Sequence, residues 1–159
     1  MGEIESKGRK ALSAFCALIS DLDGNDLSAK LVFSLSLAPH KPEVLPKGKM
    51  AVYGFFHGSR CLKIGKAGPK TGARYRHHHY RFETNSSLAL SIERYPSEVG
   101  LSEFSRPTAA NWMCENLTRI AVIVPASESL ATLSLLEAVL QFEFQPIFEG
   151  RRIKQYSPP

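Results

Sequence analysis

The spacing of apolar residues predicts a helix and then a strand in the first part of the chain. Apolar side chains at positions 12, 15, 16, 19 and 22 recur at the helical period, which predicts an amphipathic helix over residues 7–22. The turn-forming residues 23–26, which include Gly24 and Asn25, should end this helix because both tolerate positive φ. In residues 31–37 apolar and polar side chains alternate, which predicts a half-buried strand.

Three prolines, Pro39, Pro42 and Pro46, follow this strand. Proline fixes φ and lacks a backbone N–H, so the stretch favours a boundary between segments. We therefore divide the chain into an N-terminal helix-strand extension, residues 1–49, a main domain, residues 50–150, and a basic tail, residues 151–159.

The main domain opens with two short β-like runs, residues 51–56 and 61–65, which predict a β-hairpin. Side chains alternate along a strand, so the length of the loop decides which residues share a face. A three-residue loop places Tyr53 directly opposite Lys63, whereas a four-residue loop pairs Tyr53 with Ile64. Only the first arrangement builds a shared site.

The rest of the main domain predicts an α/β (α+β) fold. A helix that starts near residue 70 would carry Arg74 and His78 on one face, because they are four residues apart. Residues 111–117 read as helical, the apolar run 120–124 as a buried strand and residues 127–142 as a long helix. Residues 85–106 have no clear pattern.

Positive charge is concentrated in one window. Between Val44 and Phe82 the chain has nine Lys and Arg and no Asp or Glu; the net charge of the whole chain is +5, so the remainder sums to −4. Such a cationic stripe attracts a polyanion to one face, and nucleic acid is the natural partner. Besides the residues assigned to chemistry below, the candidate phosphate contacts are Lys47, Lys49, Arg60, Lys70, Arg76 and Arg81.

Cysteine usage and hydropathy bear on location. The three cysteines form no CxxC pair, so they indicate neither a disulfide framework nor a zinc site and fit a reducing, cytoplasmic compartment. Basic residues precede the apolar run 11–19, as in a signal peptide. We expect none here, because Ser13 and Cys16 interrupt the run and no small-x-small cleavage site follows. No stretch approaches the roughly 20 apolar residues of a membrane span. We expect no membrane partner.

The order of parts in the main domain resembles the GIY-YIG nuclease family, a small fold with a three-stranded antiparallel sheet flanked by helices. Ala51-Val52-Tyr53 takes the place of the first strand motif, and Lys63-Ile64-Gly65 resembles the known Lys-Ile-Gly variant of the second. Lys66 follows as in the Gly-Lys-Ala of one branch of the family.

Later positions extend the resemblance. Arg74-x-x-x-His78 falls where the family's helix carries its arginine and a histidine or tyrosine. Glu137 lies nine residues before Pro146, which is the spacing of the family's metal-binding glutamate. The chain departs from the family at Glu149, where an asparagine is expected.

The resemblance implies a metal-dependent endonuclease that hydrolyses DNA with one active site per chain. Glu137 would bind Mg²⁺ or Mn²⁺, and Arg74 would stabilise the phosphate. Tyr53 would activate or orient water as a phenolate favoured by Lys63 and Lys66, and His78 would hydrogen-bond to Tyr53 or share in proton transfer.

Other interpretations stay open. Tyr53 could simply pack on the sheet, Arg74 could be one more phosphate contact, and Glu137 lies on the polar stripe of its helix; for residues 77–79 we favour a solvated helix face. One alternative function is a catalytically inactive nucleic-acid-binding module of the same fold. Another is an assembly protein that forms a homodimer through residues 1–49, which could equally complete the sheet or contact another protein. The sequence does not separate DNA from RNA.

Overall fold

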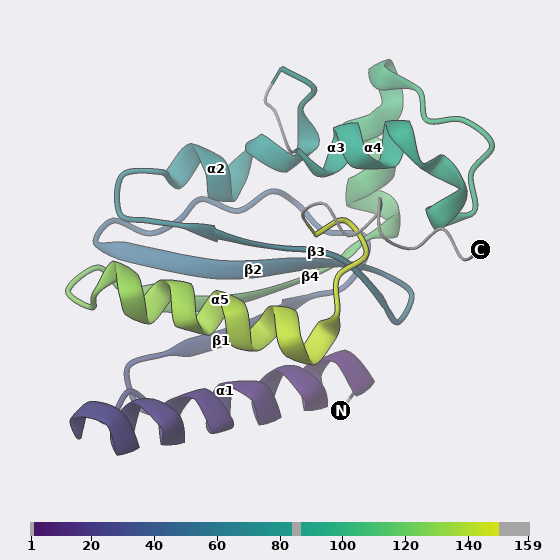
Figure 1. Cartoon of the computed structure of the whole chain (residues 1–159). Helices are drawn as coiled ribbons and strands as arrows, with labels where there is room; N and C mark the ends of the chain where they lie inside the picture. The colour runs from purple at the N-terminus through teal and green to yellow at the C-terminus, as the bar shows by residue number, and fades with distance from the viewer. Residues whose placement is uncertain (1, 84–86, 150–159) are drawn as a thin grey trace.

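The computed structural model describes residues 2–83 and 87–149, and a four-stranded antiparallel sheet lies at its centre (Figure 1). The strands are β1 (Val32–Ser36), β2 (Lys49–His57), β3 (Arg60–Ala67) and β4 (Thr118–Pro125), in the order β1-β4-β2-β3. The predicted hairpin is β2 and β3, and the apolar run near residue 120 is the buried strand β4. The basic tail, residues 151–159, lies outside the described residues.

The extension contributes the fourth strand. β1 pairs antiparallel with β4, from Val32 opposite Ile123 to Ser36 opposite Arg119. The sheet therefore has four strands rather than the three that the family resemblance implied. Residues 1–49 thus complete the sheet, which was one of their three expected roles.

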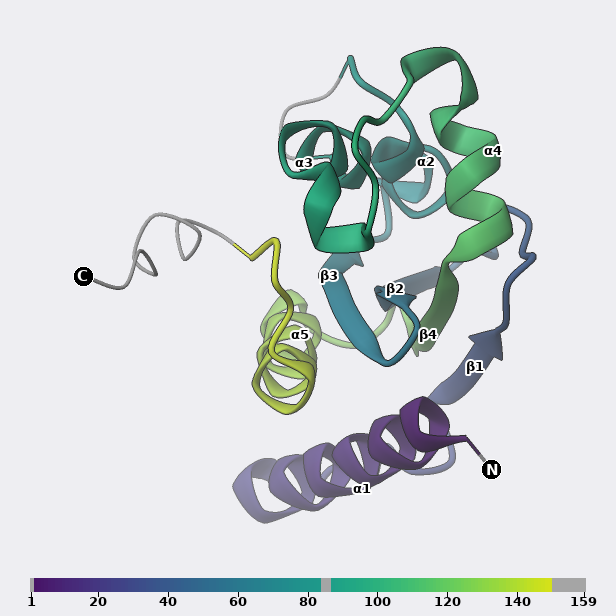
Figure 2. The same ribbon diagram turned by 90° about the vertical axis from the view of Figure 1, so that its right-hand side faces the viewer.

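Two long helices cover one face of the sheet. α1 (Glu3–Asp23) lies below β1 and α5 (Leu130–Phe144) lies toward β3, as Figure 2 shows. Phe15 of α1 and Leu136 of α5 are buried in one apolar cluster with side chains of this face. Both helices were predicted, and α1 ends as expected at Gly24, whose φ of 74° favours glycine.

Short helices cover the opposite face. They are α2 (Gly72–Arg76), the 3₁₀ helix η1 (His78–Tyr80), α3 (Leu88–Arg94), the 3₁₀ helix η2 (Pro96–Val99) and α4 (Arg106–Asn116). Their apolar side chains form a second cluster with side chains of β2. α3 and η2 fall in the region where the sequence has no clear pattern.

The hairpin register differs from the prediction. The turn is two residues long, because His57 pairs with Arg60, and a β-bulge lies between Phe55 and Phe56. Tyr53 therefore pairs with Gly65, and Lys63 pairs with Phe55. The prediction that Tyr53 pairs directly with Lys63 is therefore wrong. Lys63 lies two residues from Gly65, the partner of Tyr53, so the side chains of Lys63 and Tyr53 still share one sheet face.

α2 is shorter than predicted. It ends at Arg76, and His78 begins the separate helix η1. The expectation that Arg74 and His78 share one helical face is therefore wrong. The chain turns between them, which changes the histidine that faces the sheet.

Within the described part of the chain, none of the helices combines the length and the apolar character needed to cross a membrane.

Candidate functional site

Tyr53 lies on the central strand β2 and is fully buried. Its ring lies across Gly65 on the neighbouring strand. A Cβ atom at Gly65 would come within 3.2 Å of Cε2, Cζ and Oη of Tyr53, which is tighter than most Cβ contacts. The glycine of the second strand motif thus makes room for the tyrosine of the first.

The hydroxyl of Tyr53 is held by two groups. It lies 2.9 Å from Nε2 of His79 and donates to the carbonyl of Arg74 at 3.3 Å. His79 is also buried, so the expectation of a solvated face for residues 77–79 is wrong. The sequence pointed to His78 as the partner of Tyr53, whereas the structure brings His79 to the hydroxyl.

Burial controls the charge of this pair. It lowers the pKa of His79 to about 2, with smaller contributions from nearby cations, so the imidazole is neutral. Burial also raises the pKa of Tyr53, and this outweighs the opposing effects of Arg74 and Arg119. The expectation that Lys63 and Lys66 favour a phenolate is therefore wrong, and the phenol keeps its proton.

Glu137 projects from α5 toward the edge strand β3. Its Oε2 accepts a hydrogen bond from Nζ of Lys66 at 2.7 Å, and the same Nζ donates to Oγ of Ser134 at 3.0 Å. Glu137 also belongs to the surroundings of Tyr53, because its charge raises the pKa of that phenol while Arg74 lowers it. The carboxylate of Glu137 and the guanidinium of Arg74 therefore both act on the buried phenol, although Glu137 contacts the sheet face that α5 covers and Tyr53 lies on the other face.

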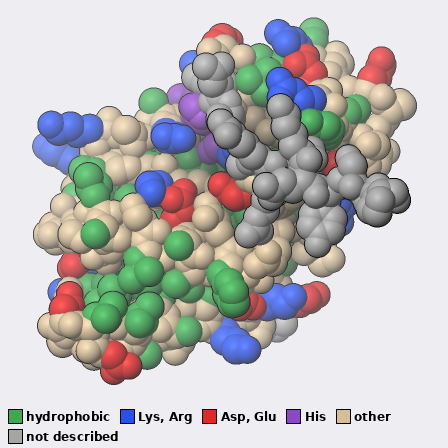
Figure 3. Space-filling view, in the orientation of Figure 1, with side chains coloured by type: hydrophobic (Ala, Val, Ile, Leu, Met, Phe, Trp, Pro, Cys, Tyr) green, Lys and Arg blue, Asp and Glu red, His purple; other side chains and the backbone are tan. Residues whose placement is uncertain are grey.

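Lys63 lies in the same neighbourhood. Its Nζ donates to the carbonyl of Phe148 at 3.4 Å. Burial and the nearby Arg74 lower its pKa, whereas Glu149 and Glu137 raise it. Figure 3 shows basic and acidic side chains side by side above α5, with histidine close to them.

The segment after α5 brings Glu149 to this edge. The backbone N–H of Phe148 donates to the carbonyl of Leu62 at 2.9 Å, so the segment runs along the outside of β3. Glu149 takes the place of the expected asparagine, and its charge acts on Lys63. A second carboxylate therefore stands on the β3 side of the site.

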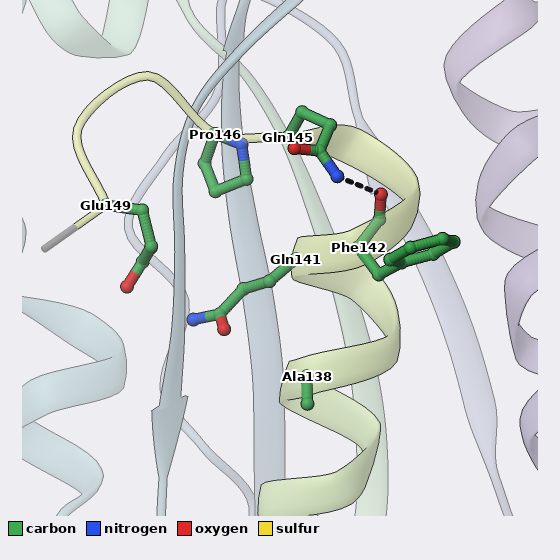
Figure 4. Close-up of a pocket in the computed structure, with 6 residues that line it drawn as sticks. All are labelled: Ala138, Gln141, Phe142, Gln145, Pro146 and Glu149. Atoms are coloured by element: carbon green, nitrogen blue, oxygen red, sulfur yellow. Dashed lines mark hydrogen bonds between the residues drawn. The ribbon is translucent and has the colours of Figure 1, made fainter. Parts of the chain in front are cut away.

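A pocket of about 230 Å³ lies where α5 ends (Figure 4). In the figure, the side chains of Gln141 and Glu149 reach into the space between α5 and the segment that follows it. Gln141 lies one turn beyond Glu137 on α5. The remaining lining residues are Ala138, Phe142, Gln145 and Pro146.

Arg119 is a buried cation that the sequence analysis did not single out. Its guanidinium carbon lies 4.0 Å from the ring centre of Tyr75 and 5.5 Å from that of Tyr53, and Nη2 donates to the Tyr75 carbonyl at 2.8 Å. Arg119 pairs with Phe55 across β4 and β2. The available signal was a single arginine immediately before an apolar β-branched run.

The candidate phosphate contacts are distributed unevenly. Lys47, Lys70, Arg76 and Arg81 are exposed, as is Arg74, and Lys49 is half-buried. Arg60 is also exposed, but its charge is paired: the guanidinium donates to the carboxylate of Glu98 at 2.7 Å and to the Glu98 carbonyl at 2.8 Å. Figure 3 shows basic side chains over α2 and the loop before it. The exposed cations of the basic window are therefore grouped over α2 and the loop before it.

Glu137 and Ser134 present a carboxylate oxygen and a hydroxyl oxygen, which are kinds of ligand that Mg²⁺ prefers, and both accept hydrogen bonds from Lys66. Among residues 2–83 and 87–149, no group of three or more His, Cys, Asp or Glu side chains is arranged to hold a metal ion. Water molecules and the substrate would supply most of the ligands of a cation bound here.

Comparisons with protein-family models, with curated proteins and with solved structures give no match for this chain.

Proposed function

We propose that the protein is a GIY-YIG-type, metal-dependent endonuclease that hydrolyses phosphodiester bonds in DNA. The observation that supports this function is that the charges of Arg74 on α2 and Glu137 on α5 both act on the pKa of Tyr53 and on that of Lys63, so that four groups from four elements share one electrostatic environment beside β3. An oxygen ligand, two cations and a phenol are the groups that such a hydrolysis needs.

Glu137 and Ser134 would hold the metal ion. When bound, Mg²⁺ or Mn²⁺ supplies positive charge next to the scissile phosphate and its leaving oxygen. Arg74, exposed on α2, would bind the non-bridging oxygens through its planar set of donors. Lys63 would add a second positive charge on the same face of the sheet as Tyr53.

Tyr53 would orient water as a neutral phenol. Its pKa is raised, so it does not take a proton near neutral pH, but its hydroxyl can exchange the Arg74 carbonyl for a water molecule. His79 would keep the hydroxyl in place through the 2.9 Å hydrogen bond. Because Tyr53 is fully buried, contact with a substrate requires that α2, which carries Arg74, shift outward from the sheet.

A nucleic-acid-binding module without catalysis is the second candidate. The burial of Tyr53 and the pairing of Glu137 with Lys66 favour it, because both leave chemical groups engaged within the protein. The exposed cations over α2 would serve this function equally well.

A plasmid nicking assay with Mg²⁺ or Mn²⁺ tests the proposal. Wild-type protein should nick the plasmid, whereas Glu137→Ala and Arg74→Ala should lose most of the activity. Glu143→Ala removes another carboxylate from α5 and should leave the rate unchanged. If wild type and Glu137→Ala show the same background, the enzyme proposal fails; DNA retention in a gel-shift assay would then support the binding module.

A further inference from the structure

The ammonium of Lys66 holds the position at Glu137 that a divalent cation would take. Nζ lies 2.7 Å from Oε2 of Glu137 and 3.0 Å from Oγ of Ser134. A metal ion would bind this carboxylate less tightly while the ammonium is there, because the two cations would repel each other.

The fold builds this arrangement from two elements. Lys66 pairs with Val52 in the hairpin, so its side chain shares the sheet face that α5 covers. Ser134 and Glu137 are three residues apart on α5 and therefore lie on one side of the helix. The pair is reachable from solvent, since the side chains of Lys66 and Glu137 are 39% and 19% exposed.

We propose that Lys66 is a positioning residue that exchanges between Glu137 and a substrate phosphate, so that nucleic acid and metal ion bind cooperatively. This inference rests on the proposed endonuclease function. Without substrate, Lys66 neutralises Glu137 and weakens metal binding. A phosphate at the site draws the ammonium away, and the freed carboxylate then binds the metal.

Lys63 is less suited to this exchange. Its Nζ is directed to the Phe148 carbonyl, and the side chain lies on the opposite sheet face, with Tyr53. Lys66 is the lysine whose ammonium contacts Glu137, on a flexible stem that can reach outward.

The coupling has a thermodynamic signature. If phosphate binding strengthens metal binding by some factor, metal binding must strengthen phosphate binding by the same factor. Removing the ammonium should raise the metal affinity of the free protein and abolish the effect of nucleic acid on it.

A Mn²⁺ titration followed by electron paramagnetic resonance measures this directly. Four full-length proteins are compared: wild type, Lys66→Met, Glu137→Gln and the control Lys10→Met, which removes an exposed lysine from α1. Each is titrated alone and with a duplex carrying phosphorothioate linkages, which resist cleavage. Lys66→Gln replaces Lys66→Met if the latter does not fold.

Lys66→Met should bind Mn²⁺ about 5-fold tighter than wild type without DNA, and Lys10→Met should match wild type. The duplex should tighten Mn²⁺ binding by wild type but not by Lys66→Met. If Glu137-dependent binding is seen yet Lys66→Met is no tighter than Lys10→Met, the exchange is overturned while the metal site stands. If Glu137→Gln binds Mn²⁺ as wild type does, both the exchange and the proposed metal site fail.

Discussion

Nε2 of His79 lies 2.9 Å from the hydroxyl of Tyr53, and both side chains are buried between the sheet and the short helices. The Tyr53 ring also packs against the imidazole in a T-shaped arrangement, with ring centres 5.4 Å apart. The phenol at the centre of the site is therefore fixed by a neutral histidine. Stability and function should both depend on this pair.

The buried histidine predicts acid sensitivity. The pKa of His79 is about 2 in the folded protein, below the usual value near 6.5, so the unfolded chain binds more protons as the pH falls below 6.5. Stability from this group is fully present above pH 6.5 and should decrease by roughly 2–3 kcal/mol between pH 7 and pH 4.5. Urea unfolding at a series of pH values measures it.

The control for this prediction is His79→Gln, which cannot be protonated. It should be less stable than wild type at pH 7 but lose less stability on acidification. Buried His40, whose pKa burial also lowers, remains in both proteins and cancels in the comparison. Equal pH dependence of the two proteins would show that folding does not change the pKa of His79.

A methyl group at Gly65 should disturb Tyr53. The new Cβ of Gly65→Ala would lie 3.2 Å from three atoms of the Tyr53 side chain, which is packed against Phe55 and Tyr75 and has little room to move. We expect a loss of about 1–3 kcal/mol in the free energy of unfolding. Gly72→Ala is the matched control, because no atom lies within 4 Å of its added Cβ; a similar loss there would rule out the close approach as the cause.

The hydroxyl of Tyr53 should matter for cleavage more than for binding. Tyr53→Phe removes the group that would orient water, so the cleavage rate should fall by about 100-fold or more. DNA affinity should change little, because the side chain is buried beneath α2 and η1. Nicking rates and gel-shift affinities give the comparison, and equal losses in both would make Tyr53 a structural residue.

The exposed arginines should set the salt dependence of DNA binding. Arg76→Ala should lower the slope of log affinity against log salt by about 1, because it removes one phosphate contact. Arg60→Ala should lower it less, since the carboxylate of Glu98 already neutralises that guanidinium. Equal effects of the two substitutions would contradict this assignment of the binding surface.

The sequence predicted the elements that carry the site better than the contacts within it. Alternation alone left two outcomes open for Tyr53 and Lys63, and the two-residue turn with its bulge gives the one in which both share a sheet face. The spacing from Glu137 to Pro146, taken from the family resemblance, selected the carboxylate that contacts β3 through Lys66. The strands and long helices, by contrast, follow from local periodicity, which a single sequence displays.

His79 and Arg119 depend on tertiary packing and were missed. A continuous helix would have placed His78 above Arg74, but α2 ends at Arg76, and three consecutive histidines give no sign of which one turns inward. Arg119 is buried against aromatic rings from other elements, including Tyr75. No local pattern near Arg119 contains those rings.

The central claim is that Tyr53 and Glu137 belong to one hydrolytic site, and a double-mutant cycle on the nicking rate tests it most directly. Residues that act as a unit are strongly non-additive, so Tyr53→Phe combined with Glu137→Ala should be no slower than the more damaging single variant. If the two losses multiply, the residues act independently and the shared site is contradicted.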